Sequence, residues 1–157
     1  MIVKYGKGFY VGKTIQDRVM ELEQSMLELP QAECPVKHYF APGLYAREMS
    51  IPKHTVVTGA IHKTENLVVV SMGRLQIVTD DGTKEVKAGE TFTCKAGMKN
   101  AVFTLEDSRW TNFFPNPGNE TDADKLAEIL THSKASELLG GSNNLQLAAN
   151  KAAMIEG

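Results

Sequence analysis

The sequence predicts a mainly β fold, either a sandwich or a closed barrel of antiparallel strands. Between residues 35 and 114, strand-like runs of five to eight residues alternate with turn residues at about ten-residue spacing. Asp80-Asp81-Gly82, between two of these runs, is typical of a hairpin because glycine adopts a positive φ without steric cost. Apolar residues at helical spacing lie outside this region, toward both ends of the chain.

The predicted strands follow from short apolar, β-branched and aromatic runs that end at glycine, proline or aspartate. Their ranges are 44–51, 55–61, 67–72, 74–79, 84–88, 91–95, 101–106 and 109–114. Eight strands of this length are enough for a small barrel that encloses one core.

A helix is predicted before the strands. Thr14 and Asp17 form a T-x-x-D start signal, and Pro30 stops the pattern. Apolar residues recur at steps of four and three between these signals: Ile15, Val19, Leu22, Met26 and Leu29.

Two further helices are predicted after the strands. Thr121 and Asp124 are expected to start the first, with Leu126, Ile129 and Leu130 on its apolar face. The alanine-rich segment 145–157 favours a second helix that needs a surface to pack on. The expected organisation is one structural domain, with an N-terminal helical arm at 1–34, a barrel at 35–114 and a C-terminal helical extension at 115–157.

Composition narrows the class of protein. The net charge of -2 gives no indication of nucleic acid as a partner. There is no apolar stretch near the roughly 20 residues that cross a membrane, and the first 13 residues lack the apolar run of a secretion signal. We therefore expect a cytoplasmic protein in which Cys34 and Cys94 are reduced.

The order of histidine, turn, strand and glycine resembles the cupin superfamily, whose fold is a jelly roll, a double-stranded β-helix. The first cupin motif is G-x5-H-x-H-x3/4-E-x6-G. Aligned on Gly73, this chain has His54 at the leading glycine, Ala60 and His62 at the two histidines, and Asn66 at the glutamate. The resemblance covers about residues 43–114.

The second cupin motif, G-x5-P-x-G-x2-H-x3-N, is matched by its glycines. Gly89 and Gly97 are present, Lys95 replaces the proline, and Asn100 replaces the histidine. The turn-forming glycines of the motif are therefore kept, whereas a metal ligand is kept at one of the four ligand positions. Because glycines set backbone shape and ligands set chemistry, the resemblance implies the fold with a degenerate metal site.

A narrower resemblance is to small cupin-fold proteins of bacteriophages. It rests on segment 43–82, with the IPKHT and IH stretches, and on segment 96–114. By this alignment too His62 is retained, and Phe114 stands where a histidine often ends the last strand. The resemblance implies a phage source, with the host cytoplasm or the virion as location and a virion or host protein as a partner.

A metal site remains an alternative. His62 and Glu65 flank one turn, and zinc or iron(II) in a catalytic site needs about three protein ligands. His54 lies eight residues before His62, roughly 26 Å along an extended strand, so these two cannot share a metal unless the strand bends sharply. His38 joins them only if the fold brings it near.

A metal-free pocket at the barrel mouth is the other prediction for the site. Its candidate residues are His62, Asn66, Asn100, Trp110, Phe114, Tyr45 and Arg47. Asparagine keeps donors and acceptors without charge, and Arg47 is a candidate anion binder if it points inward. The structural alternatives are a hydrogen-bonded His62, a packed Trp110 and a solvated Arg47.

Three functions follow as hypotheses. The first is a non-catalytic cupin that assembles as a homo-oligomer, suggested by apolar stripes in the terminal arms. The second is a protein that binds or sequesters a small molecule at the barrel mouth. The third is a metal-dependent enzyme with unusual ligands. We expect no cofactor, and a zinc or iron ion is the alternative.

Overall fold

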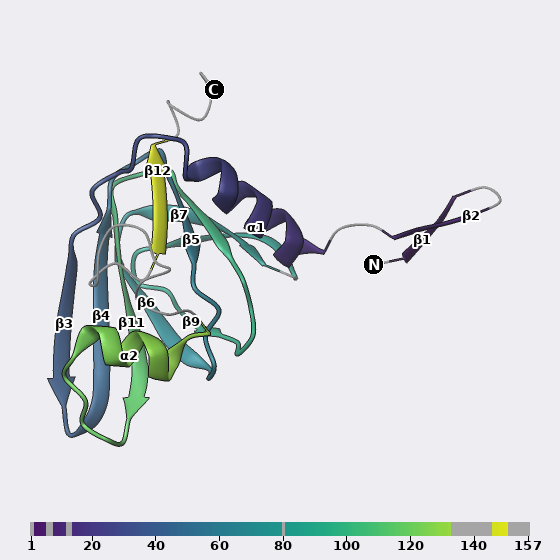
Figure 1. Cartoon of the computed structure of the whole chain (residues 1–157). Helices are drawn as coiled ribbons and strands as arrows, with labels where there is room; N and C mark the ends of the chain where they lie inside the picture. Colours follow the sequence, from purple (N-terminus) through teal and green to yellow (C-terminus); the bar gives the residue numbers. More distant parts are fainter. Residues whose placement is uncertain (1, 6–7, 12–13, 80, 133–145, 151–157) are drawn as a thin grey trace.

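Two five-stranded antiparallel sheets form the body of the chain and enclose its main core (Figure 1). The computed structural model describes residues 2–5, 8–11, 14–79, 81–132 and 146–150. One sheet has the order β12 (Gln146–Asn150), β5 (Thr55–Gly59), β10 (Ala101–Thr104), β7 (Arg74–Thr79) and β8 (Gly82–Lys87). The other has the order β3 (Val36–Ala41), β4 (Gly43–Ile51), β11 (Ser108–Asn116), β6 (Asn66–Met72) and β9 (Thr91–Cys94).

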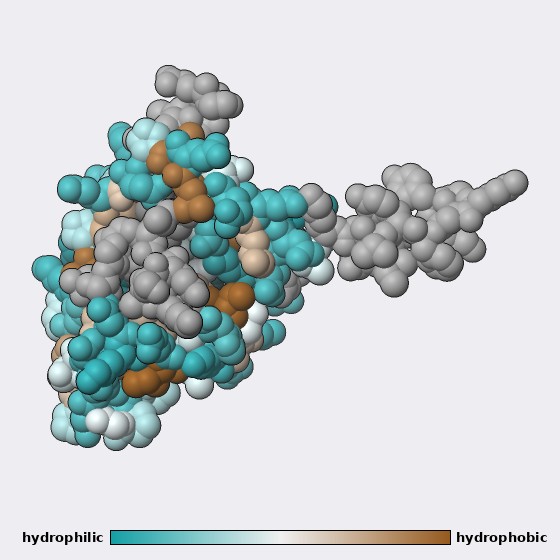
Figure 2. Space-filling model, viewed as in Figure 1, coloured by the Kyte–Doolittle hydropathy of each residue, from teal (hydrophilic) through white to brown (hydrophobic). Residues whose placement is uncertain are grey.

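All eight predicted strands are confirmed, as β4 to β11. Residues from both sheets meet in one core, to which Met49, Val70, Leu75, Val102 and Trp110 belong. Apart from the hairpins β3–β4 and β7–β8, neighbours in each sheet are not consecutive in sequence, as in a jelly roll. On the face that Figure 2 shows, hydrophilic residues dominate and apolar residues form small separate patches.

The prediction misses β3, an edge strand that pairs with β4. Its side chains are half-buried or exposed throughout, so it lacks the alternation of apolar and polar residues by which strands are found. β3 extends the β4 sheet by one strand at the barrel end where the candidate site lies.

Helix α1 (Ile15–Met26) begins as predicted. Thr14 Oγ1 accepts a hydrogen bond from the Asp17 amide at 3.1 Å, and Asp17 accepts from the Thr14 amide at 3.0 Å. Val19 and Met26 are buried, and Met26 packs with Leu22, Leu29 and Val56 of β5. The apolar stripe of α1 is thus covered by the barrel of its own chain.

An ion pair also fastens α1 to the barrel. Lys99, buried just before β10, is bonded to the Glu23 carboxylate of α1. We expect Glu23→Gln to lower the free energy of unfolding by about 2 kcal/mol, because it leaves a buried ammonium without its counterion. Urea denaturation at pH 7 checks this, with exposed Glu28→Gln as the control. Equal stability of the Glu23 and Glu28 variants would refute the prediction.

Helix α2 (Ala123–Leu130) starts one residue later than Thr121, as the first residue of the start signal, predicts. Its N-cap is Asp122, whose side chain accepts from the amides of Asp124 and Lys125 at 2.9 and 3.1 Å. Leu126 and Leu130 are buried as predicted, but Ile129 is 55% exposed, so its place on the apolar face was wrong. The buried residues pack against Tyr45 and Phe114, next to the candidate site.

Strands occur in both terminal segments: two lie in the N-terminal arm before the predicted helix, and one lies where the second C-terminal helix was expected. Residues 2–11 contain β1 (Ile2–Tyr5) and β2 (Gly8–Val11), which pair with each other, because β-branched and aromatic residues dominate both. β12 lies in the alanine-rich segment and pairs with β5, so sheet pairing overrides helix propensity there. Leu145 and residues 151–157 lie outside the described residues.

His54 stands where the cupin motif has glycine, and it adopts the backbone conformation that glycine favours, with φ +58°. The side chain is exposed and stacks on Phe103, with ring centroids 6.4 Å apart. We expect His54→Gly to raise the free energy of unfolding by about 0.5–1 kcal/mol and His54→Val to lower it, because positive φ strains residues with a Cβ. Thermal denaturation of both variants checks the order, and a less stable glycine variant would contradict it.

None of the helices in the described part of the chain has both the length and the apolar character that a membrane-spanning helix needs.

Candidate functional site

Polar side chains gather inside one end of the barrel, where five strands contribute inward-facing residues. Alternation along β4 and β11 turns Arg47 and Asn112 inward, and these two residues are direct cross-strand partners. Two residues further along each strand, on the same face, Tyr45 pairs with Phe114. On the other side of β11, Asn66 of β6 pairs with Cys94 of β9. The strand register therefore brings these residues together.

A chain of hydrogen bonds links three of the buried side chains. Asn112 Nδ2 donates to Asn66 Oδ1 at 2.8 Å, and Asn66 Nδ2 donates to His62 Nδ1 at 3.3 Å. A neutral imidazole has one acceptor nitrogen, so this network places the His62 proton on Nε2. We call His62, Asn66 and Asn112 the amide–imidazole chain.

His62 is held from several sides. Its backbone bridges to Thr131, directly after α2, and its carbonyl accepts from the Gly97 amide at 2.9 Å. Its ring lies 5.3 Å from the ring of Phe114, at 58°. Residues that close this end of the barrel therefore fix the imidazole against the sheet.

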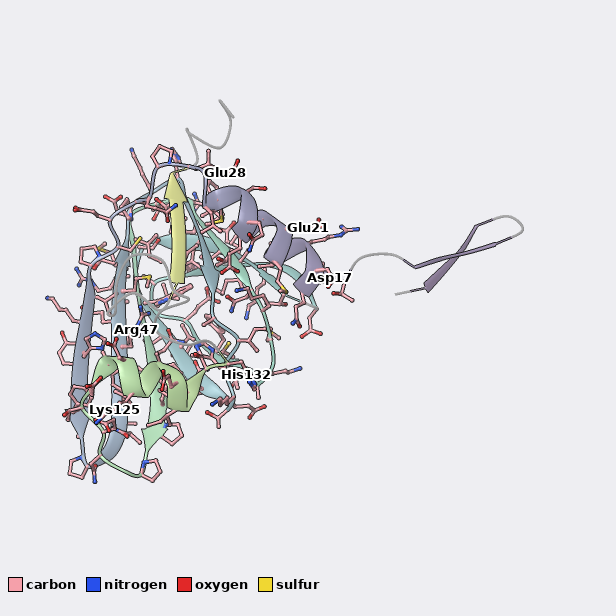
Figure 3. All side chains as sticks on the ribbon, in the orientation of Figure 1. Asp17, Glu21, Glu28, Arg47, Lys125 and His132 are labelled. Atoms are coloured by element: carbon pink, nitrogen blue, oxygen red, sulfur yellow. The ribbon has the colours of Figure 1, made fainter. Side chains whose placement is uncertain are left out.

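Arg47 is a buried cation beside the amide–imidazole chain. Arg47 lies among the strands in Figure 3, and burial lowers its pKa to about 10, so it stays charged at pH 7. Burial and the charge of Arg47 lower the pKa of His62 to about 4, so the imidazole is neutral. Burial also raises the pKa of the Cys94 thiol, which lies 4.0 Å from His62 Nδ1, so it stays protonated.

His38 of β3 extends this cluster. Its Nδ1 and the Tyr45 hydroxyl share a hydrogen bond of 2.6 Å, and the two rings stack. Burial, with the charge of Arg47 as a smaller cause, lowers the pKa of His38 below its usual value. Both interior histidines are therefore neutral near pH 7.

Two cavities meet at Asn100. A small inner cavity of about 10 Å³ lies against His62, Asn100, Trp110 and Asn112. That volume holds about one water molecule. A groove of about 250 Å³ opens outward between β7, β8 and β9, and it shares Ile77, Phe92, Cys94 and Asn100 with the inner cavity. The shared residues therefore form the wall between the inner cavity and the groove.

Similar folds occur among solved structures. The plu4264 protein from Photorhabdus luminescens has a TM-score of 0.50 at 12% identity, over 59% of this chain and 83% of that one. KdgF from Halomonas sp. has a TM-score of 0.49 at 16% identity, over 60% and 88%. A cupin superfamily protein from Desulfitobacterium hafniense has 0.47 at 12%, over 58% and 84%. The sequence matches no protein-family model and no curated protein.

The two facing sheets and their strand order form a jelly roll. The chain shares this fold with the plu4264 protein. At these identities the likeness concerns the fold alone. The comparisons give no support to the narrower bacteriophage-type resemblance.

The side chains of this site do not fit the divalent metal that the resemblance implies as an alternative. Within the described residues, no three His, Cys, Asp or Glu side chains are grouped to hold an ion. Glu65 is exposed at its turn, and His54 is exposed at another. His62 therefore has a protonated thiol and two amides as neighbours, and the guanidinium of Arg47 opposes a second positive charge.

Most predicted pocket residues lie together. His62, Asn100 and Trp110 line the inner cavity, and Asn66 and Phe114 contact His62. Tyr45 stacks on Phe114, with ring centroids 5.8 Å apart. Arg47 is buried rather than solvated.

Two residues of the cluster were missed from the sequence. Asn112 shares the inward face of β11 with Trp110 and Phe114, so alternation along RWTNFF contained the signal. Cys94 was expected to be a reduced cysteine and was not predicted as a pocket residue. Its place beside Asn66 depends on how β6 and β9 pair, which spacing along the chain does not give.

Proposed function

We propose that this cupin binds a small organic molecule in the groove between β7, β8 and β9, with one end of the molecule directed toward the amide–imidazole chain. The observation that supports this most is the shared wall of Ile77, Phe92, Cys94 and Asn100 between the groove and the polar inner cavity. A concave apolar surface with a few convergent polar groups is the usual form of a ligand site.

The backbone at Gly59 leaves room for the Asn100 side chain between the groove and the inner cavity. A Cβ at Gly59 would lie 2.7 Å from Asn100 Oδ1, so glycine lets Asn100 sit at the junction of the two cavities. Asn100 Nδ2 is directed to Cys94 Sγ at 3.9 Å, a weak acceptor. The amide is therefore held in place and retains hydrogen-bonding capacity for a ligand.

A thermal-shift screen with a metabolite panel tests the proposal. We expect at least one compound to raise the melting temperature of the native chain but not of Thr83→Phe, which fills the groove. Thr91→Phe is the matched control, because Thr91 is an exposed threonine on β9 that does not line the groove. A compound that stabilises all three proteins equally, or a panel without any shift, would count against a ligand in the groove.

Self-assembly is the second candidate, and the outer face of the β4 sheet favours it. The strand registers align Tyr39, Ala46, Phe113 and Leu67 in one row across β3, β4, β11 and β6. Tyr39 and Leu67 are each 50% exposed. In the next row Lys37 pairs with Glu48, so the same surface on a second copy offers opposite charges.

Light scattering at micromolar concentration tests this candidate. We expect a dimer for the native chain, a monomer for Leu67→Lys, and a dimer for Ser71→Lys, an exposed residue of β6 outside the row. A monomeric native chain would refute assembly through this face, and so would a Leu67→Lys variant that remains a dimer.

A further inference from the structure

The two cavities offer a buried hydrogen-bond donor in the inner cavity and two lysines at the rim of the groove. The indole Nε1 of Trp110, a residue only 5% exposed, has no hydrogen-bond acceptor among the described residues. Trp110 lines the inner cavity together with the amides of Asn100 and Asn112. A buried N–H without an acceptor costs free energy, so an oxygen atom in this cavity would be stabilised by it.

The rim of the groove adds positive charge. Lys84 and Lys95 line it, with Asp81 as the acidic residue among the described lining residues. Asp81 and Lys95 form an ion pair of 3.8 Å, but both are largely exposed, so the pair contributes little. The ammonium of Lys84 lies 5.7 Å from the ring centroid of Phe92, over the groove wall.

The wall between the rim and the inner cavity is apolar. Ile77, Phe92 and Met98 line the groove. A cavity of about 150 Å³ is known to hold benzene, so the groove of about 250 Å³ has room for one ring with a substituent.

From these observations, and resting on the proposed function, we propose that the ligand is a small carboxylate with an apolar body. One carboxylate oxygen replaces the water that the inner cavity can hold and accepts a hydrogen bond from Trp110 Nε1. The apolar body lies on Phe92 and Ile77. The charge of Lys84 at the rim favours the anion over a neutral compound of the same shape.

The chain carries its own reporter, because Trp110 is its only tryptophan. Benzoate, benzamide and benzylamine are probes of nearly equal shape with negative, neutral and positive charge. Titrations at constant ionic strength, followed by Trp110 fluorescence, are expected to show benzoate binding about fivefold to tenfold tighter than benzamide, with benzylamine weakest.

Two variants locate the groups responsible. Lys84→Gln is expected to weaken benzoate about threefold and leave benzamide unchanged, whereas Lys87→Gln on the same strand, outside the groove, changes neither. Trp110→Phe keeps an aromatic ring but removes the N–H, and calorimetry is expected to show about tenfold weaker benzoate binding. Far-ultraviolet circular dichroism confirms that each variant is folded.

Several results would overturn the inference. Equal affinity for benzoate and benzamide would refute selection for an anion, and so would tighter binding of benzylamine. Unchanged benzoate affinity in Trp110→Phe would refute the hydrogen bond to Nε1. If none of the three probes binds while a compound of the metabolite panel stabilises the native chain but not Thr83→Phe, the carboxylate inference fails and the proposed function stands.

Discussion

Acidification from pH 7 to about pH 4 is expected to lower the free energy of unfolding by roughly 3 kcal/mol through His62. Burial and the charge of Arg47 lower the pKa of His62 from 6.5 to about 4 in the folded chain. Between these two values the unfolded chain binds a proton that the folded chain does not, so stability falls as the pH falls. Above pH 6.5 the contribution is fully present, and below about pH 4 no further stability is lost through this residue.

The comparison of the native chain with His62→Gln isolates this effect. Urea denaturation from pH 7 to pH 4.5 is expected to give a distinctly smaller loss of stability for the variant. His38, whose pKa is also lowered, remains in both proteins and contributes equally to both. If the two proteins lose the same free energy over this range, His62 is not a buried neutral imidazole.

Asn112→Leu is expected to lower the free energy of unfolding by about 2–3 kcal/mol, the second large effect. The side chain is similar in size, so the main change is the loss of the donor to Asn66 Oδ1. Asn66 is only 4% exposed, so its carbonyl would be left in the interior without that partner. Asn66 Nδ2 would also be less firmly oriented toward His62.

A double-mutant cycle checks whether the two amides act as a unit. Asn66→Leu with Asn112→Leu is expected to cost clearly less than the sum of the single variants, because replacing both partners removes the unsatisfied group. Asn116→Leu is the control for the loss of a buried amide on β11, since Asn116 bonds to Glu120 rather than to Asn66. Additive effects for Asn66 and Asn112 would contradict a hydrogen-bonded amide–imidazole chain.

The strands of the barrel could be predicted from the sequence because the signals for them are local. Turn residues separate short strands, and Gly73, with φ +83° and no room for a Cβ beside Asp107 and Ser108, shows why the motif requires glycine there. β12 was missed because its alanines favour a helix, and only its pairing with β5 makes it a strand. Local propensity carries no information about such a distant partner.

The candidate site was predictable in part for the same reason. Alignment to the cupin motif found His62, Asn66 and Asn100, which occupy neighbouring positions at the end of the barrel. Glu65 was chosen for its distance from His62 along the chain, but it is exposed. Asn112 and Cys94 approach His62 through the pairing of β11 and β9 with β6, which depends on tertiary structure.

We propose that the end of this barrel is a hydrogen-bonded site for an organic ligand in place of a metal centre. Elemental analysis tests it most directly, on the full chain expressed with added zinc, iron and manganese and purified without chelator. The account predicts metal far below one equivalent per chain, with the same value for His62→Ala. About one equivalent in the native chain that disappears in His62→Ala would contradict it.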